Sequence, residues 1–435
     1  MNSMVMIRPF KGYRYNLARI KDLADVVTPP YDVISDAQRE AFSKRSEYNY
    51  VHLILPKDDR GDKYADSAAR LEQWIHAGVF MKDPEESIYV YGHTFKYSGK
   101  EYTRLGFVAL VEIEPLGKGV LPHEKTFPKP MEDRLKLMEA NKANLEQIFF
   151  IYNDEPNIIE SILQKAIAGK PEDEKFEDDD GGIQRLWRVS DKEIVGAVFK
   201  EMQKQQCVIA DGHHRYKTSA EYYARHPEIA AARYRMVSFV NSSNPGLLIL
   251  PTNRILYNIG KIDIKKVLDK VETYFKVECM PSAEQMVEKL RSIPAVDGKK
   301  GVKSNVLGMQ CNIDGHSYIL TLKNPSVLDE KYPGQSTGYR HLDLNVLHKL
   351  LIDECLGIKD DALEIGKNVE YVKGNEETMK KMQDTKKYQI GFYVRAVLVE
   401  EIFQVTRTGE VMPHKTTFFY PKMYSGLVFW KMDES

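Results

Sequence analysis

The sequence predicts a mixed α+β fold in which sheets and helices interleave along the chain. Short apolar or alternating runs typical of strands recur along it, and amphipathic segments typical of helices separate them. The composition agrees, because 43% hydrophobic and 29% charged residues are ordinary for a soluble globular protein. A chain of 435 residues is long enough for two or three domains.

The elements follow one another in a regular order. Apolar or alternating runs predict strands at 87–97 and 102–114 (a pair joined by the turn SGKE), 149–153, 207–211, 236–241, 247–257, 388–394, 416–421 and 426–430. Helical periodicity predicts helices at 65–80, 131–149, 190–203 (with Ser190 as N-cap and Glu193 completing a capping box), 215–226, 341–357 and 397–407. Helices and paired strands of this kind in one chain are typical of an α+β protein.

Three regions are expected. Residues 1–105 form an N-terminal α/β region, 106–240 a catalytic core, and 241–435 a C-terminal α+β region. The core carries an acidic insertion near 171–182, PEDEKFEDDDGG, which is interpreted as an exposed, mobile loop.

Charge and cysteine content exclude several classes of protein. The net charge of -1 lacks the basic footprint of a nucleic-acid-binding protein, although a local basic cleft stays possible. The first residues do not resemble a signal peptide, and the chain has no run of apolar residues long enough for a membrane span. The four cysteines are widely spaced and predict buried or free thiols. A cytoplasmic protein is expected.

The stretch CVIADGHHRYKT at 207–218 is the main candidate site. A buried strand delivers Asp211 and Gly212 to the start of a helix, whose first N–H groups attract anions. Arg215 can bind phosphate or carboxylate in a bidentate manner, and His213 and His214 can donate to phosphate or move a proton near neutral pH. These residues together predict a phosphate site.

The same stretch has plainer interpretations. Asp211 alone is a common type of helix N-cap, with the histidines and Arg215 on the surface. A zinc site is disfavoured, because adjacent histidines rarely ligate one metal and no cysteine pair is near.

Two further motifs carry titratable side chains before this site. In PHEKTF at 122–127, Glu124 is a candidate general base that the neighbouring His123 and a lysine would tune, and a solvated loop is the alternative. In TPPYDVIS at 28–35, Tyr31 and Asp32 follow two prolines, and Asp32 could orient a substrate amine or ligate a metal. A rigid connector with Asp32 as a turn cap is the alternative there.

Basic side chains elsewhere are candidates for binding phosphate. Arg134 lies in a predicted helix, and Lys415 and Lys422 flank an aromatic strand near the C-terminus. Both lysines could serve one site only if Pro421 bends the chain, because side chains seven apart on a strand face opposite sides. An edge strand protected by lysine and proline is the alternative.

Six motifs occur in an order that resembles a known family. They are PPYDVI, PHEKTF with the following arginine, IADGHHRYKTSAEY, LPTNR, VEY and MPHKTTFFYPK with the following SGL. Together they resemble a bacterial and archaeal family catalogued as a domain of unknown function (family ten-fifteen), over nearly the whole chain. That family commonly has His where LPTNR has Asn253, which puts a role for this position in doubt.

A narrower resemblance, over residues 106–225, is to the ParB/sulfiredoxin fold. In that fold a turn matched here by Gly212, His214 and Arg215 binds nucleotide phosphates. Free-serine kinases with this fold use a glutamate as base and an aspartate at the phosphoryl site. The matching residues are Glu124 and Asp211.

These resemblances imply a kinase that phosphorylates the hydroxyl of free L-serine to O-phosphoserine. Asp211 would orient the hydroxyl or hold Mg²⁺, with His213 as a further catalytic group. Donor phosphates are expected at Gly212, His214, Arg215, Arg134, Lys415 and Lys422, and substrate contacts at Tyr31, Asp32, His123, Thr126 and Arg254. Pyrophosphate, ADP or ATP could be the donor, since neither a Walker loop nor a dinucleotide fingerprint is present. The alternatives are a ParB-like nucleotide-dependent switch that binds DNA or protein, and a phosphoserine phosphatase.

Overall fold

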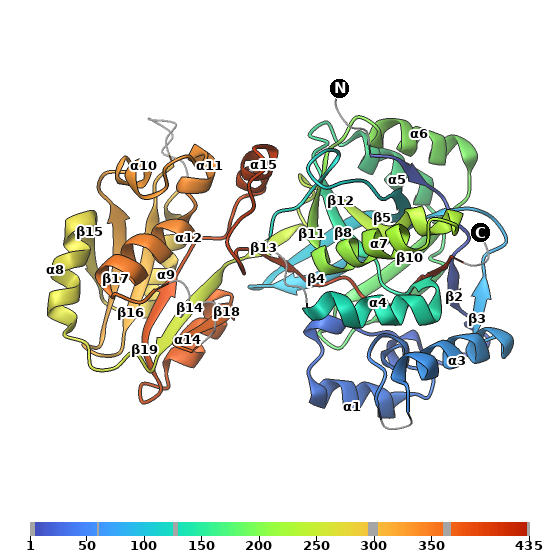
Figure 1. Cartoon of the computed structure of the whole chain (residues 1–435), viewed down its shortest axis with the longest axis horizontal. Coiled ribbons are helices and arrows are strands. Elements are labelled where there is room, and N and C mark those ends of the chain that lie inside the picture. The colour runs from blue at the N-terminus through green and yellow to red at the C-terminus, as the bar shows by residue number, and fades with distance from the viewer. Residues whose placement is uncertain (1–4, 59–60, 125–128, 295–302, 360–366, 433–435) are drawn as a thin grey trace. The chain divides into compact units, whose positions relative to one another are not determined.

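The computed structural model describes residues 5–58, 61–124, 129–294, 303–359 and 367–432 (Figure 1). The predicted mixed α+β fold is confirmed, because sheets and helices alternate along the chain. The chain divides into two compact units, each built around its own sheet. Unit 1 contains residues 1–122, 126–248 and 421–435, and unit 2 contains residues 123–125 and 249–420.

Unit 1 is built on a nine-stranded sheet. Its strands are β1 (Ile7–Arg8), β4 (Ile88–Tyr97), β5 (Lys100–Glu112), β6 (Val120–Leu121), β8 (Ile148–Tyr152), β9 (Glu174–Glu177), β10 (Ile183–Val189), β11 (Cys207–Asp211) and β12 (Tyr234–Asn241). The order is β6-β11-β8-β12-β5-β4-β10-β9, with β1 paired to β5. Most neighbours are antiparallel, but β11 runs parallel to β6 and β12 runs parallel to β8. This puts β11 close to one edge of the sheet.

Helices and short strand pairs surround this sheet. The helices are α1 (Asp36–Arg45), α2 (Val51–Ile54), α3 (Lys63–His76), α4 (Lys129–Asn141), α5 (Ile158–Ile167), α6 (Lys192–Met202) and α7 (His213–Arg225), with 3-10 turns η1 (Leu23–Asp25), η2 (Tyr31–Val33) and η3 (Ala230–Arg233). Two further pairs join β2 (Tyr13–Tyr15) to β3 (Phe80–Lys82), and β7 (Ala143–Asn144) to β21 (Trp430–Lys431). Helices α4 and α7 pack side by side (Figure 1).

The core of unit 1 lies between the sheet and two of its helices. Phe107, Phe150 and Phe239 come from neighbouring strands and are completely buried. The rings of Phe107 and Phe239 stack with 4.9 Å between their centroids. Leu163 of α5 and Val198 of α6 belong to the same buried cluster. Burying large apolar side chains from both layers is what fixes the sheet, and therefore the end of β11.

Unit 2 has a six-stranded sheet of its own. The order is β15-β17-β16-β19-β14-β18, with every pair antiparallel. The strands are β14 (Thr252–Tyr257), β15 (Phe275–Met280), β16 (Val306–Cys311), β17 (His316–Leu322), β18 (Val369–Lys373) and β19 (Tyr388–Tyr393); β20 (Phe418–Tyr420) lies outside this sheet, and β13 (Leu248–Leu250) begins at the unit boundary. The helices are α8 (Ile264–Tyr274), α9 (Ala283–Ser292), α10 (Val327–Lys331), α11 (Thr337–Arg340), α12 (Asp343–Val346), the π-helical η4 (Leu347–Cys355), α14 (Asn375–Met382) and α15 (Val399–Arg407).

Three local predictions were wrong. The acidic stretch is not simply a solvated loop, because β9 pairs with β10 there and Glu174 is buried. The helix predicted over 131–149 ends at Asn141, and a short strand follows. The N-cap of α6 is Asp191 rather than Ser190, since the Asp191 side chain accepts from two backbone N–H groups of the first turn. Each error came from local patterns that long-range strand pairing or a neighbouring cap residue overrode.

The described residues also bear on the expectations about membrane spans and cysteines. None of their helices combines the length and apolarity needed to cross a bilayer. All four cysteines are free thiols, and only Cys279 is exposed.

Candidate active site

The end of β11 holds the main candidate residue. A bulge between Ile209 and Asp211 shifts the register against β8 just before the strand ends. Bulges of this kind re-aim a side chain at the rim of a sheet. Gly212 then has φ 91° and precedes α7, and a Cβ there would lie 2.9 Å from Arg215 Nε. Glycine is therefore required both by the left-handed backbone and by the close approach of Arg215.

Asp211 lies between two cations. Arg215 Nη2 donates to Asp211 Oδ2 at 2.6 Å, and Lys422 Nζ donates to Asp211 Oδ1. Arg215 Nη1 also donates to the Gln147 carbonyl at 2.5 Å, which fixes the guanidinium. Burial raises the pKa of Asp211, but the charges of Lys422 and Arg215 outweigh burial and hold the pKa at about 2. The carboxylate is thus ionised at any physiological pH.

This geometry corrects the interpretation of Asp211 as a helix cap. The N-cap of α7 is Gly212, which has no side chain with which to cap the helix. Asp211 is the last residue of β11 and its carboxylate is bonded to Arg215 and Lys422 instead. His213 and His214 form the first turn of α7, with His213 buried and its charge contributing to the low pKa of Asp211. The first turn therefore presents backbone donors and histidines next to a fixed carboxylate.

The TPPYDVIS motif belongs to the same cluster of charges. Tyr31 and Asp32 lie in η2. Partial removal of water by the surrounding protein and the charge of Asp211 raise the pKa of Asp32. The charges of Arg215 and Lys422 lower it, but the net shift is upward. The residue itself remains exposed to solvent. Asp32 is therefore within the electrostatic reach of Asp211, Arg215 and Lys422.

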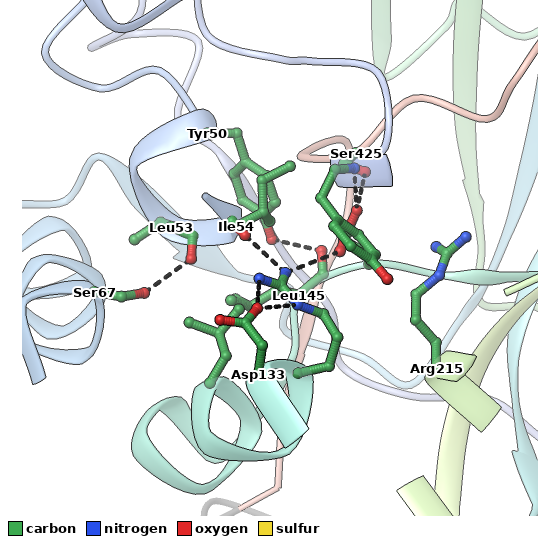
Figure 2. Close-up of polar contacts among 12 residues, drawn as sticks. Tyr50, Leu53, Ile54, Ser67, Asp133, Leu145, Arg215 and Ser425 are labelled. Carbon is green, nitrogen blue, oxygen red and sulfur yellow. Dashed lines mark hydrogen bonds and ion pairs between the residues drawn. The ribbon is translucent and has the colours of Figure 1, made fainter. Parts of the chain in front are cut away.

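A second buried carboxylate, Glu146, ties this cluster together. Its Oε1 accepts from the Tyr31 backbone N–H at 3.0 Å and from Ser425 Oγ at 3.2 Å. Arg134 Nη1 lies 4.0 Å from Glu146 Oε2, and its guanidinium stacks over the Tyr31 ring at 4.2 Å. Figure 2 shows Tyr50, which donates to the Leu145 carbonyl, and Ser425, with Arg215 to their right. Segments distant in the sequence are therefore held to one another through Glu146.

Arg134 is committed to structural bonds. Its Nη1 donates to the Ile54 carbonyl at 2.7 Å, and its Nε and Nη2 donate to Asp133 Oδ2 (Figure 2). Burial raises the pKa of Asp133, but Arg134 outweighs it and brings the pKa to about 2. The expected role of Arg134 in holding a donor phosphate stays a prediction, and its bond to Ile54 joins α4 to the end of α2.

The remaining predicted residues belong to unit 2. His123 is buried, and its Nε2 is 2.7 Å from Thr417 Oγ1. Glu124 forms a parallel bridge with Met412. Arg254 is completely buried, and its Nη2 donates to the carbonyls of His414 and Lys415 at 3.3 and 3.2 Å. Residues 123–124 and Arg254 thus both contact the segment 412–417, through one backbone bridge and through the side chains of His123 and Arg254.

The charges in this second cluster are coupled. Burial lowers the pKa of Arg254 to about 10, and the charge of Glu124 opposes that shift. The Lys415 side chain is exposed and its backbone is left-handed, with φ 56°. Thr126 lies outside the described residues. Lys422 therefore accompanies Asp211 in unit 1, whereas Lys415 belongs to unit 2.

Asn253, at the position where the family commonly has histidine, makes structural bonds. Its Nδ2 donates to Asn375 Oδ1 and Thr378 Oγ1, both at 2.9 Å, and its Oδ1 accepts from the Val394 N–H at 3.0 Å. The side chain is completely buried and holds the start of α14 against the sheet.

The described side chains leave the predicted Mg²⁺ ligand, Asp211, a prediction. They contain no group of three or more His, Cys, Asp or Glu residues that could hold a metal. Both oxygens of Asp211, the predicted ligand, are bonded to cations. In this structure the Asp211 carboxylate binds the side chains of Arg215 and Lys422.

Sequence reasoning missed Glu146 and Arg235. Both are buried, and the backbone carbonyl of Glu146 accepts from Arg235 Nη2 at 2.5 Å. Glu146 lies in a stretch predicted as helix, and Arg235 directly precedes a predicted strand, so neither stood out as a motif. The one signal that could have indicated Arg235 is its position, a charged residue directly before an apolar strand.

The fold and site define a mixed α+β protein with a half-buried, cation-flanked carboxylate at the end of a strand, just before a helix. The chain belongs to the family described as Protein of unknown function (DUF1015), whose profile matches residues 7–345. A comparison with curated proteins found no match.

Several solved structures are distantly similar. A mutant of a free serine kinase in complex with AMP has a TM-score of 0.35 and 13% identity, covering 75% of this chain and 93% of that chain. A second mutant, in complex with ADP, gives the same four values. A conserved hypothetical protein from Pyrococcus furiosus has a TM-score of 0.33 and 14% identity, covering 75% and 96%.

Proposed function

We propose that this protein is a small-molecule kinase that transfers a phosphoryl group to the hydroxyl of free L-serine. The observation that carries the proposal is the Asp211 carboxylate, kept ionised between Lys422 and Arg215 next to the first turn of α7. The serine acceptor comes from the motifs that resemble free-serine kinases, in which Asp211 and Glu124 match the phosphoryl site and the base.

This arrangement suits phosphoryl transfer for a physical reason. The reaction depends on positioning the reactants and on neutralising the charge of the transferring group. Lys422, Arg215 and the N–H groups of α7 supply positive charge around one point, and Asp211 supplies an acceptor for a hydroxyl proton or hydrogen bond. A donor phosphate entering the site would compete with Asp211 for these cations and so release the carboxylate to meet the serine hydroxyl.

Further roles rest on the sequence motifs. Glu124 is proposed to take the proton of the serine hydroxyl, and His213 and His214 to bind the donor phosphates. Mg²⁺ is proposed to arrive with the donor, since this ion keeps several waters and commonly binds through one or two carboxylates plus substrate phosphates. Pyrophosphate, ADP and ATP all remain possible donors.

One assay tests the function directly. Purified protein with Mg²⁺ and L-serine is given ATP, ADP or pyrophosphate in turn, and O-phosphoserine is followed by phosphorus NMR. Formation of phosphoserine from one donor supports the proposal and identifies that donor. If no donor gives phosphoserine, the kinase proposal is wrong.

Two control reactions separate the alternatives. Release of phosphate from added phosphoserine without an acceptor would make the protein a phosphatase. A salt-sensitive shift of duplex DNA in a gel, without turnover, would make it a binding protein.

A further inference from the structure

A small cavity in unit 1 lies among three buried arginines. Its volume is about 30 Å³, and its polar lining comes from Arg134, Glu146, Arg215, Thr218 and Arg235. A cavity needs about 10–15 Å³ to hold one water molecule, so this one has room for about two water-sized atoms, such as two oxygens of an oxyanion.

Two lining residues have hydrogen-bonding groups without partners among the described residues. Arg235 is 3% exposed, and its Nε and Nη1 have no partner although Nη2 donates to the Glu146 carbonyl. Thr218 is 1% exposed, and its Oγ1 also has no partner. Buried donors left unsatisfied are costly, and such groups in a native protein indicate a missing ligand or ordered water.

The Arg235 guanidinium donors that lack a partner among the described residues favour an oxyanion as the ligand, and the Glu146 carboxylate lines the cavity beside them. Arg134 is bonded to Asp133 and Arg215 to Asp211, whereas Arg235 has no ion pair with a carboxylate among the described residues and donates to the backbone carbonyl of Glu146. Burial and the charge of Arg215 lower the pKa of Arg235 to about 9, and the charge of Glu146 opposes that shift. A guanidinium that is buried beside another cation is stabilised by an anion, and its planar N–H groups match the oxygens of an oxyanion.

We propose that this cavity is an oxyanion subsite that binds inorganic phosphate through Arg235 and Thr218. Arg235 Nε and Nη1 donate to two phosphate oxygens, and the Thr218 hydroxyl donates to a third. The subsite is additional to the proposed donor site at the start of α7, and Arg215 is the residue that borders both.

The test is calorimetric titration of the full-length protein with inorganic phosphate at constant ionic strength. The wild type is expected to show saturable binding. Arg235→Met should weaken it by at least ~10-fold and Thr218→Val by several-fold, because each removes hydrogen bonds to a charged ligand. Arg225→Met is the matched control on α7, since Arg225 is exposed and paired with Glu221, and its affinity should equal that of the wild type.

Folding and location are controlled separately. Thermal unfolding monitored by circular dichroism identifies any variant that fails to fold, and Thr218→Val, nearly equal in shape to the native residue, keeps the test decisive if Arg235→Met unfolds. Absence of saturable phosphate binding by the wild type overturns the proposal. So does binding that His214→Ala abolishes and that Arg235→Met or Thr218→Val leaves unchanged, because phosphate would then be bound at the start of α7. Phosphoserine formation is measured in a separate assay, so the phosphate subsite and the kinase function can each be disproved without the other.

Discussion

Lys422 and Asp211, 211 positions apart in the sequence, form an ion pair at the end of β11. Lys422 lies in the C-terminal segment 421–435, which returns to unit 1 after the chain has formed unit 2. Ser425 of the same segment donates to Glu146. The C-terminal segment therefore completes the charge pattern around Asp211, and the site cannot be assembled from the D-G-H-H-R stretch alone.

Replacing Lys422 tests whether this cation serves the reaction. Lys422→Met is expected to lower kcat for phosphoserine formation by about 10²–10³-fold, as loss of one preorganised donor to a developing charge commonly does. The pKa of Asp211 should rise, because the charge of Lys422 is a main cause of its low value. Steady-state kinetics measures the first effect. Lys136→Met, which removes an exposed lysine of α4, is the control and should leave kcat unchanged; equal kinetics for the two variants would remove Lys422 from the proposed machinery.

Gly212 offers a test of the turn geometry. Gly212→Ala should destabilise unit 1 by about 1–3 kcal/mol, because the backbone has φ 91° and the new Cβ would press on Arg215. Gly196→Ala is the matched control: Gly196 lies inside α6 with open space around it, so alanine there should stabilise the helix by about 1 kcal/mol. Urea unfolding of both variants gives the two free energies. A Gly212→Ala variant as stable as the wild type would mean that the turn is not held in this conformation.

The pH dependence of stability follows from Asp211. Its pKa is about 2 in the folded protein against an ordinary 3.8, so the ionised form contributes stability that is fully present above about pH 4 and lost as the pH falls toward 2. The difference in free energy of unfolding between wild type and Asp211→Asn should therefore shrink by about 2 kcal/mol over that interval. Urea unfolding at several pH values measures it. Asp58→Asn, at an exposed position, is the control; a difference that stays constant with pH would show that Lys422 and Arg215 do not depress this pKa.

The sequence predicted the strand pair 87–97 and 102–114 and the strand–turn–helix at Asp211, because each depends on local signals. Alternation and the SGKE turn specify the hairpin β4–β5, and an apolar run before D-G specifies the end of β11. Residue chemistry in the motifs was enough to single out Arg215 and Lys422 before their contact with Asp211 was known.

The remaining features of the fold and the site depend on long-range contacts, which no local sequence pattern indicates. Glu146 carries no motif, and its importance comes from Tyr31, Ser425 and Arg134 meeting it from distant segments. Glu174 lies in a run of acids that suggests a solvated loop, yet strand pairing buries it beside Arg14. Burial of a charge is decided by the tertiary fold, so composition alone misjudges such residues.

Replacing Glu124 tests the remaining catalytic assignment. Glu124→Gln keeps the size and hydrogen-bonding capacity of the side chain but removes the base, so kcat should fall by about 10²–10⁴-fold while the Kd of the donor, measured by calorimetry, stays the same. The pKa of Arg254 should fall further, because the charge of Glu124 now supports it. Glu193→Gln, on the exposed side of α6, is the matched control and should behave as the wild type. An unchanged kcat in Glu124→Gln would assign the proton to another group, and Asp32, whose pKa is raised, would be the first carboxylate to replace. A weakened donor affinity with unchanged kcat would instead make Glu124 a residue that supports donor binding, through its effect on Arg254.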